Sequence, residues 1–179
     1  MHRRWQGYCF DLREEPEQLD TVLLWLHAEW LKQRKNTIQN PAEAYGLRRI
    51  QLQEHLAPSA VPLTLIAKES KSDTQPVLGC VSMARLASAS PLASLELNHA
   101  LWLSNLFVTP TARGLGIGSA LLQAVEAQAR DLGHMEMYLY TQSSKAYYTS
   151  KGWRECLIKP RGGTAVAVTP IAVLKKQLS

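Results

Sequence analysis

A glycine-rich loop, residues 113–119, separates two apolar segments and constrains the fold of this chain more than any other feature. Residues 101–108 before it have the composition of a strand, and residues 117–132 after it have the apolar spacing of a helix. The first N–H groups of a helix have no intrahelical partner, and the helix dipole adds positive charge there. Glycines let an anion approach the backbone closely, and Arg113 adds a cation. The loop therefore predicts a ligand that carries phosphates.

The spacing of the glycines narrows the class of phosphate ligand. Gly114 and Gly116 fit the start of the dinucleotide pattern G-x-G-x-x-G, but Ser119 stands at its third glycine position. No lysine follows the glycines as it does in the phosphate loop of nucleoside triphosphatases. The pattern that fits is R-x-x-G-x-G, which runs from Arg113 to Gly118.

A second motif lies downstream of the loop. Residues 135–141 have the composition of a strand, and a short helix with the aromatic pair Tyr147 and Tyr148 is expected after them. Tyr148 stands four residues before Gly152, which Trp153 follows. One predicted helix and one predicted strand separate the two motifs, so their order and spacing are a more specific signal than either motif alone.

Together the two motifs resemble the GCN5-related N-acetyltransferase (GNAT) superfamily, most clearly over residues 101–156. The resemblance implies an enzyme that moves an acetyl group from acetyl-CoA to a primary amine by direct attack in a ternary complex. It implies acetyl-CoA as the cosubstrate and no metal. The acceptor amine stays open between a small molecule and a peptide or protein amino group.

The resemblance also implies where acetyl-CoA would bind. Backbone N–H groups near Leu106, Phe107 and Val108 would hold the pantetheine arm and polarise the thioester carbonyl. The pyrophosphate would lie against the loop formed by Arg113, Gly114, Leu115, Gly116, Ile117, Gly118 and Ser119. The alternative for the loop is a tight turn in which the glycines serve only steric needs.

Two proton transfers need side chains. The resemblance makes Tyr148 the candidate general acid for the departing thiolate, with simple packing as the alternative. Glu96, just before the predicted central strand, is the candidate general base, and His99 is a second candidate. For both, the alternative is an ordinary surface residue. Many members of the family use a chain of waters as the base instead, so activity does not depend on finding such a side chain.

The order of the predicted elements indicates a mixed α/β, α+β fold in one domain, residues 1–179. The expected helices are 16–33, 41–55 and 117–132, and the expected strands are 8–13, 61–68, 77–86, 101–108, 135–141, 164–168 and 171–174. They do not alternate strictly, which favours a sheet with helices on both faces. The family resemblance adds a mostly antiparallel, twisted sheet whose two parallel central strands splay apart.

Charge and cysteine content limit the expected partners and compartment. The net charge is +5, but the lysines and arginines are scattered, so a local patch for an anionic cosubstrate is expected rather than a nucleic-acid surface. The three cysteines are far apart and form no C-x-x-C pair, which favours reduced thiols. No apolar signal segment or membrane-spanning run is present, so a cytoplasmic protein without membrane contact is expected, either monomer or homodimer.

Two other functions stay open at the level of the sequence. One is a non-catalytic CoA-binding sensor or interaction module, which would keep the loop without turnover. The other is a toxin-like acetyltransferase acting on aminoacyl-tRNA, which the basic charge permits. Binding of acetyl-CoA without transfer would favour the first, and a salt-dependent affinity for tRNA would favour the second.

Overall fold

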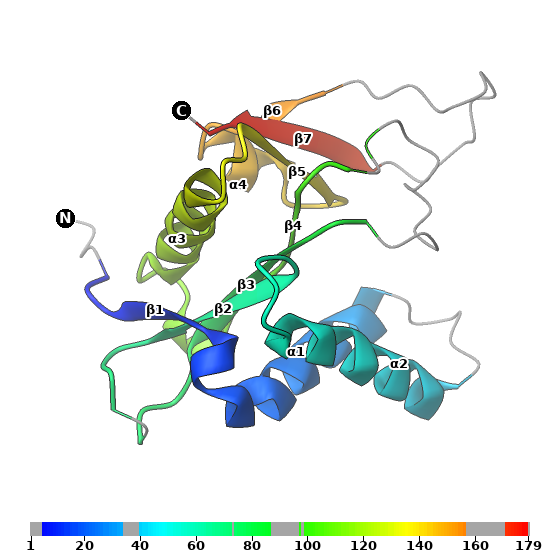
Figure 1. Ribbon diagram of the computed structural model, residues 1–179, viewed down its shortest axis with the longest axis vertical. Helices are drawn as coiled ribbons and strands as arrows, with labels where there is room; N and C mark the ends of the chain where they lie inside the picture. Colours follow the sequence, from blue (N-terminus) through cyan, green and yellow to red (C-terminus); the bar gives the residue numbers. More distant parts are fainter. Residues whose placement is uncertain are drawn as a thin grey trace. The chain divides into compact units, whose positions relative to one another are not determined.

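The computed structural model describes residues 5–33, 40–72, 74–86, 97, 99–156 and 171–178. Seven strands are hydrogen-bonded in the order β1-β2-β3-β4-β5-β7-β6 (Figure 1). β4 and β5 are parallel, whereas β1 with β2, β5 with β7 and β6 with β7 are antiparallel. A mixed, mostly antiparallel sheet combined with helices confirms the predicted α+β class.

The described elements follow the predicted order with shifted ends. The strands are β1 (Tyr8–Asp11), β2 (Leu63–Lys68), β3 (Gly79–Ala84), β4 (Trp102–Val108), β5 (Glu136–Thr141), β6 (Arg154–Glu155) and β7 (Ala172–Gln177). The helices are α1 (Leu19–Gln33), α2 (Pro41–Gln53), α3 (Ile117–Asp131) and α4 (Lys145–Thr149). Short 3-10 turns are η1 (Leu12–Glu14), η2 (Pro16–Gln18), η3 (Glu54–Leu56) and η4 (Pro110–Ala112). β6 was not predicted, and the strand expected over 164–168 lies outside the described residues.

The chain divides into two compact units, and each is described by itself. The first unit comprises Met1–Ser82 and Asn105–Ala124, and the second comprises Met83–Ser104 and Val125–Ser179. β4 and α3 therefore each contribute residues to both units. The glycine-rich loop belongs to the first unit and the Tyr148 motif to the second.

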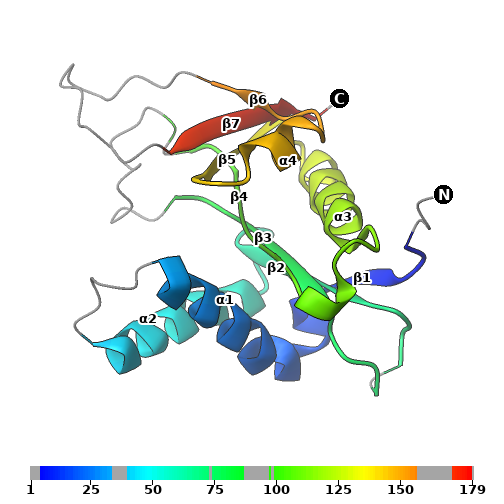
Figure 2. The same cartoon turned by 180° about the vertical axis from the view of Figure 1, so that it is seen from behind.

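In the first unit, α1 and α2 lie side by side (Figures 1 and 2). α1 buries Leu19, Val22 and Leu23, which share one cluster with Leu52 of α2. The spacing of these residues puts them on one helical face, and their burial stabilises the helix pair.

In the second unit, β5 pairs with β7 along its whole length (Figure 2), and the start of β4 lies beside β5 with Trp102 opposite Tyr138. α3 buries Val125 and Ala129, and the chain after it turns at Gly133, whose φ is +81°. Glycine reaches this left-handed conformation without the penalty a Cβ would impose, which suits the end of a helix. No helix in the part of the chain described here is long and apolar enough to cross a membrane.

Candidate functional site

The glycine-rich loop forms the turn between β4 and α3 in the first unit. After β4, the 3-10 turn η4 leads to Gly114 and Gly116, whose φ angles are +80° and +90°. Gly116 C=O accepts the first helical hydrogen bond, from Ala120 N–H at 3.0 Å. The N–H groups of the residues in between therefore belong to the unpaired first turn of α3. The predicted glycines thus hold the two left-handed positions that open the helix.

The guanidinium of Arg113 is fixed beside this turn. Arg113 Nε donates to the backbone C=O of Val108 at 3.0 Å, and Cζ lies 5.9 Å from the centre of the Phe107 ring. The side chain is exposed, as are Gly114 and Leu115. A cation is therefore positioned at the N-terminus of a helix, where the dipole also favours an anion.

The strand that leads to the loop contains a residue that sequence reasoning missed. Asn105 has a φ of +56°, an unusual value for a residue other than glycine. Its Nδ2 donates to Ser82 Oγ at 3.1 Å, and its C=O accepts from Cys80 Sγ at 3.4 Å. Asn is among the few residues that tolerate this region, which is the only local signal for it. The strained residue immediately precedes the segment Leu106, Phe107 and Val108.

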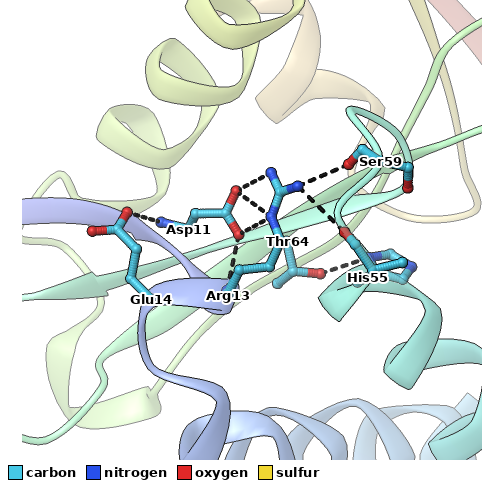
Figure 3. Close-up of polar contacts among 7 residues, drawn as sticks. Asp11, Arg13, Glu14, His55, Ser59 and Thr64 are labelled. Carbon is cyan, nitrogen blue, oxygen red and sulfur yellow. Dashed lines mark hydrogen bonds and ion pairs between the residues drawn. The ribbon is translucent and has the colours of Figure 1, made fainter.

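A buried chain of polar side chains supports Asn105. Ser82 Oγ lies 2.8 Å from Thr64 Oγ1. Thr64 Oγ1 lies 2.8 Å from His55 Nδ1 (Figure 3). Ser82 and Thr64 are fully buried, and His55 is nearly so. Burial lowers the pKa of His55, so its imidazole is neutral at pH 7. This series of hydrogen bonds links η3, β2 and β3 to Asn105 of β4.

An ion pair near His55 fixes the turn that follows η3. Arg13 Nε donates to both carboxylate oxygens of Asp11 at 3.0 Å, and Nη1 donates to the C=O groups of Ala57 and Ser59 (Figure 3). The hydrogen bond that Arg13 donates to Asp11 raises the pKa of the guanidinium, which stays charged. These contacts tie the chain after His55 to the end of β1.

Tyr148 lies on α4 in the second unit, half-buried against two aromatic rings. Its ring is edge-on to Tyr147 at 5.3 Å and to Trp153 at 6.3 Å. Burial raises the pKa of Tyr148 to about 12, so the phenol is protonated at neutral pH. A protonated phenol can donate a proton or a hydrogen bond, as a general acid requires.

The turn after α4 is anchored to a buried carboxylate that the sequence did not single out. Glu126 of α3 accepts from Trp153 Nε1 at 3.2 Å and from Lys176 Nζ at 2.8 and 2.9 Å. Lys176 Nζ also donates to Lys151 C=O at 2.8 Å. Trp153 N–H in turn donates to Tyr148 C=O at 3.2 Å. The position of Tyr148 therefore depends on residues from α3 and β7.

Replacing Glu126 by glutamine is expected to destabilise the second unit by about 1–3 kcal/mol, because the Lys176 ammonium loses its buried counter-charge. Urea unfolding at pH 7 measures the change. Glu155→Gln is the matched control, since Glu155 forms an exposed pair with Lys145. Equal stability of the two variants would contradict the anchoring role of Glu126.

The other predicted site residues are placed as follows. Glu96 lies outside the described residues, and His99 is exposed, with its C=O accepting from Arg85 Nη1. Among the residues with described positions, no three His, Cys, Asp or Glu side chains are grouped to hold a metal ion.

Comparison with solved structures establishes the fold. An acetyltransferase of the GNAT family from Staphylococcus aureus is 18% identical, with a TM-score of 0.63, and the match covers 97% of this chain and 100% of that one. The protein yncA from Salmonella typhimurium, solved with its cofactor acetyl-CoA, is 15% identical with a TM-score of 0.61, over 97% and 95% of the two chains. An aminoglycoside 6'-acetyltransferase type Ii is 16% identical with a TM-score of 0.63, over 96% and 97%.

Comparison of sequences establishes the family. No curated protein sequence matches the chain. The family model of the acetyltransferase (GNAT) domain matches residues 64–155, which is just over half of the chain. The matched residues include β4, the whole glycine-rich loop and Tyr148. This chain belongs to the GNAT acetyltransferase family.

Proposed function

We propose that this protein transfers the acetyl group of acetyl-CoA to a primary amine, by direct attack in a ternary complex. The observation that carries the proposal is the turn from β4 into α3, where two left-handed glycines, an unpaired first helical turn and Arg113 come together. These groups together fit a pyrophosphate, because they combine backbone N–H donors with a fixed cation. The solved Salmonella relative with acetyl-CoA bound supports the choice of cosubstrate.

In the proposed reaction, the nitrogen of the amine attacks the thioester carbonyl carbon. A C–N bond forms, the C–S bond breaks, and the products are an N-acetyl amine and CoA. Backbone N–H groups of Leu106, Phe107 and Val108 hold the pantetheine arm and stabilise the developing oxyanion. Tyr148 gives its proton to the departing thiolate. Glu96 or a water takes the proton that the amine loses.

The proposal treats residues 1–179 as one acetyltransferase domain acting in the cytoplasm. Prearranged donors and direct transfer remove the need for a covalent intermediate on the enzyme. Burial raises the pKa of the Cys80 thiol to about 12, so Cys80 is protonated and unreactive at pH 7. This supports direct transfer.

Calorimetric titration with acetyl-CoA, with desulfo-CoA and with ATP tests the cosubstrate. Both CoA compounds are expected to bind and ATP is not. The absence of any acetyl-CoA binding would overturn the proposal. Binding of acetyl-CoA without transfer to any amine would instead favour the non-catalytic sensor.

Replacing Gly116 by valine is expected to weaken acetyl-CoA binding at least about tenfold. A side chain at a φ of +90° is strained, by roughly 1–2 kcal/mol and more for a β-branched residue, and tenfold corresponds to about 1.4 kcal/mol. A Cβ at Gly116 would meet Trp5 N only at 3.7 Å, so the effect reports backbone conformation rather than a clash. The same titration measures it.

Gly46→Ala is the matched control for this variant. Gly46 lies in α2, and a Cβ there would have nothing within 4 Å. This substitution is expected to leave the acetyl-CoA affinity unchanged. Unchanged affinity in Gly116→Val as well would show that the loop does not bind the cosubstrate.

A further inference from the structure

Two contacts from β3 hold Asn105 in its left-handed conformation. The backbone C=O of Asn105 accepts from Cys80 Sγ at 3.4 Å, and its side-chain Nδ2 donates to Ser82 Oγ at 3.1 Å. Burial raises the pKa of the Cys80 thiol to about 12, so the sulfur keeps the proton that it donates. Cys80 and Ser82 stand two residues apart on β3, and their side chains therefore leave the strand on the same face. The conformation of Asn105 is thus fixed through both its backbone and its side chain.

The Ser82 hydroxyl belongs to a series of hydrogen bonds with one consistent direction. An amide NH₂ group can only donate, so Ser82 Oγ accepts from Asn105 and its own proton is available for Thr64 Oγ1. Burial lowers the pKa of His55, and its neutral imidazole can accept the Thr64 proton at Nδ1. Each hydroxyl therefore accepts one hydrogen bond and donates another. A buried series of this kind orders its members together.

The two ends of the series line a cavity in the first unit, whereas its middle is sealed from solvent. Asn105 and His55 are both lining residues of this cavity. Ser82 and Thr64 have no exposed surface. Neither hydroxyl can therefore touch a bound molecule, and an effect of Ser82 or Thr64 on bound acetyl-CoA has to pass through a neighbouring residue.

Asn105 immediately precedes the segment to which the proposed function assigns the thioester, residues 106–108. In a regular strand the side chains and the peptide groups alternate in direction from one residue to the next. A left-handed residue breaks this alternation, as it does in a β-bulge, and re-aims the groups beside it. The direction in which residues 106–108 present their N–H groups thus depends on the φ of Asn105, which is +56°.

We propose that Ser82 and Thr64 are positioning residues which, acting through Asn105, aim the backbone N–H groups of residues 106–108 at the thioester carbonyl of acetyl-CoA. This inference rests on the proposed acetyl transfer. Stabilisation of a developing oxyanion requires donors that are aimed before the reaction begins. Loss of either hydroxyl breaks the series that holds the Asn105 amide, so the donors lose their direction. The glycine-rich loop still binds the pyrophosphate, and the affinity for acetyl-CoA is therefore kept while the polarisation of its carbonyl is lost.

The infrared band of acetyl-CoA, labelled with a stable isotope at the thioester carbonyl carbon, measures this polarisation. Binding to the wild-type protein is expected to move the band to lower wavenumber, because hydrogen bonds to the oxygen weaken the C=O bond. Ser82→Ala and Thr64→Val are each expected to lose at least about half of this shift. Their Kd for acetyl-CoA, measured by calorimetry, is expected to stay within about threefold of the wild-type value. The experiment uses acetyl-CoA alone, so it does not require the acceptor amine to be known.

Two control variants match Thr64→Val. Thr64→Ser keeps the hydroxyl and is expected to retain the wild-type shift of the carbonyl band. Thr74→Val removes the hydroxyl of an exposed pair, in which Thr74 Oγ1 lies 2.8 Å from Ser72 Oγ, so it repeats the same chemical change outside the buried series. This variant is also expected to retain the wild-type shift.

Asn105→Gly separates an effect that passes through Asn105 from general damage to β3. Glycine adopts a φ of +56° without the penalty of a Cβ, and it has no amide for Ser82 to hold. Adding Ser82→Ala to Asn105→Gly is therefore expected to leave the carbonyl band where Asn105→Gly alone places it. In the wild-type background the same substitution is expected to move the band, and this difference measures the coupling of the two residues.

Four results would overturn this inference. Acetyl-CoA could bind the wild-type protein without any shift of its carbonyl band. Ser82→Ala and Thr64→Val could keep the full shift, or they could weaken binding as strongly as they reduce the shift, which would indicate a structural role. Ser82→Ala could move the band equally with and without Asn105→Gly, which would show that its effect bypasses Asn105. In each of these cases the wild-type protein still binds acetyl-CoA, and the proposed cosubstrate stands. Failure of the wild-type protein to bind acetyl-CoA would overturn the proposed function and this inference with it.

Discussion

Replacing Tyr148 by phenylalanine is expected to lower kcat about 100-fold or more, while the affinity for acetyl-CoA stays within about threefold. A positioned general acid typically contributes about 10²–10⁴-fold, and the substitution removes only the hydroxyl that would donate the proton. The phenylalanine ring keeps the edge-on contacts with Tyr147 and Trp153. Steady-state rates and calorimetry of the same variant separate the loss in kcat from any loss in binding.

The pH dependence gives a second readout for Tyr148. Its pKa is raised to about 12, so the acid form persists through pH 7–10 and is lost only as the pH rises through about 12. The wild-type rate is therefore expected to show no decline below pH 10 that comes from ionisation of this phenol. A fall in kcat with a midpoint between pH 8 and 10 that disappears in Tyr148→Phe would contradict both the raised pKa of the Tyr148 phenol and its protonation below pH 10.

Tyr147→Phe is the matched control, because Tyr147 lies on the same helix and is more exposed. Its loss in kcat is expected to be less than about threefold. If both variants lose activity equally, the effect comes from the packing of α4 rather than from proton donation. If Tyr148→Phe keeps the wild-type kcat, Tyr148 is not the general acid.

Local patterns made the elements and the loop predictable. Ile117, Leu121 and Val125 recur at helical spacing and all three are buried in α3. Leu132, the last residue of the helix expected over 117–132, is 37% exposed and lies one residue beyond the end of α3 at Asp131. β6 could not be predicted, since two exposed residues are too few to show an alternation of apolar and polar side chains.

Long-range contacts made the rest of the site unpredictable. The positive φ of Asn105 is stabilised by Ser82 and Cys80, which lie more than twenty residues away in the sequence. Glu126 meets Lys176 across fifty residues, and neither has a neighbour in the sequence that reveals the pair. Sequence spacing can show a loop or a helix face, but it cannot show which distant side chains share one buried contact.

The largest effect on stability is expected at a buried ion pair in the first unit. Lys68 is fully buried at the end of β2, and its Nζ donates to the two carboxylate oxygens of Glu15 at 2.9 and 2.8 Å. Glu15 is only 8% exposed. Lys68→Met would leave this carboxylate without its counter-charge, which is expected to cost about 3–5 kcal/mol in the free energy of unfolding. For a chain of this size that corresponds to a fall in Tm of roughly 10 °C.

The double variant Lys68→Met/Glu15→Leu is expected to recover most of this loss, because apolar residues of similar volume avoid the desolvation of both charges. Lys145→Met is the surface control, since Lys145 and Glu155 form a pair in which both side chains are about half exposed. Pairs of that kind contribute less than about 1 kcal/mol. Urea unfolding of the four proteins at pH 7 measures all three differences. If Lys68→Met lowers the free energy of unfolding no more than Lys145→Met does, the buried Glu15 carboxylate is neutralised in another way.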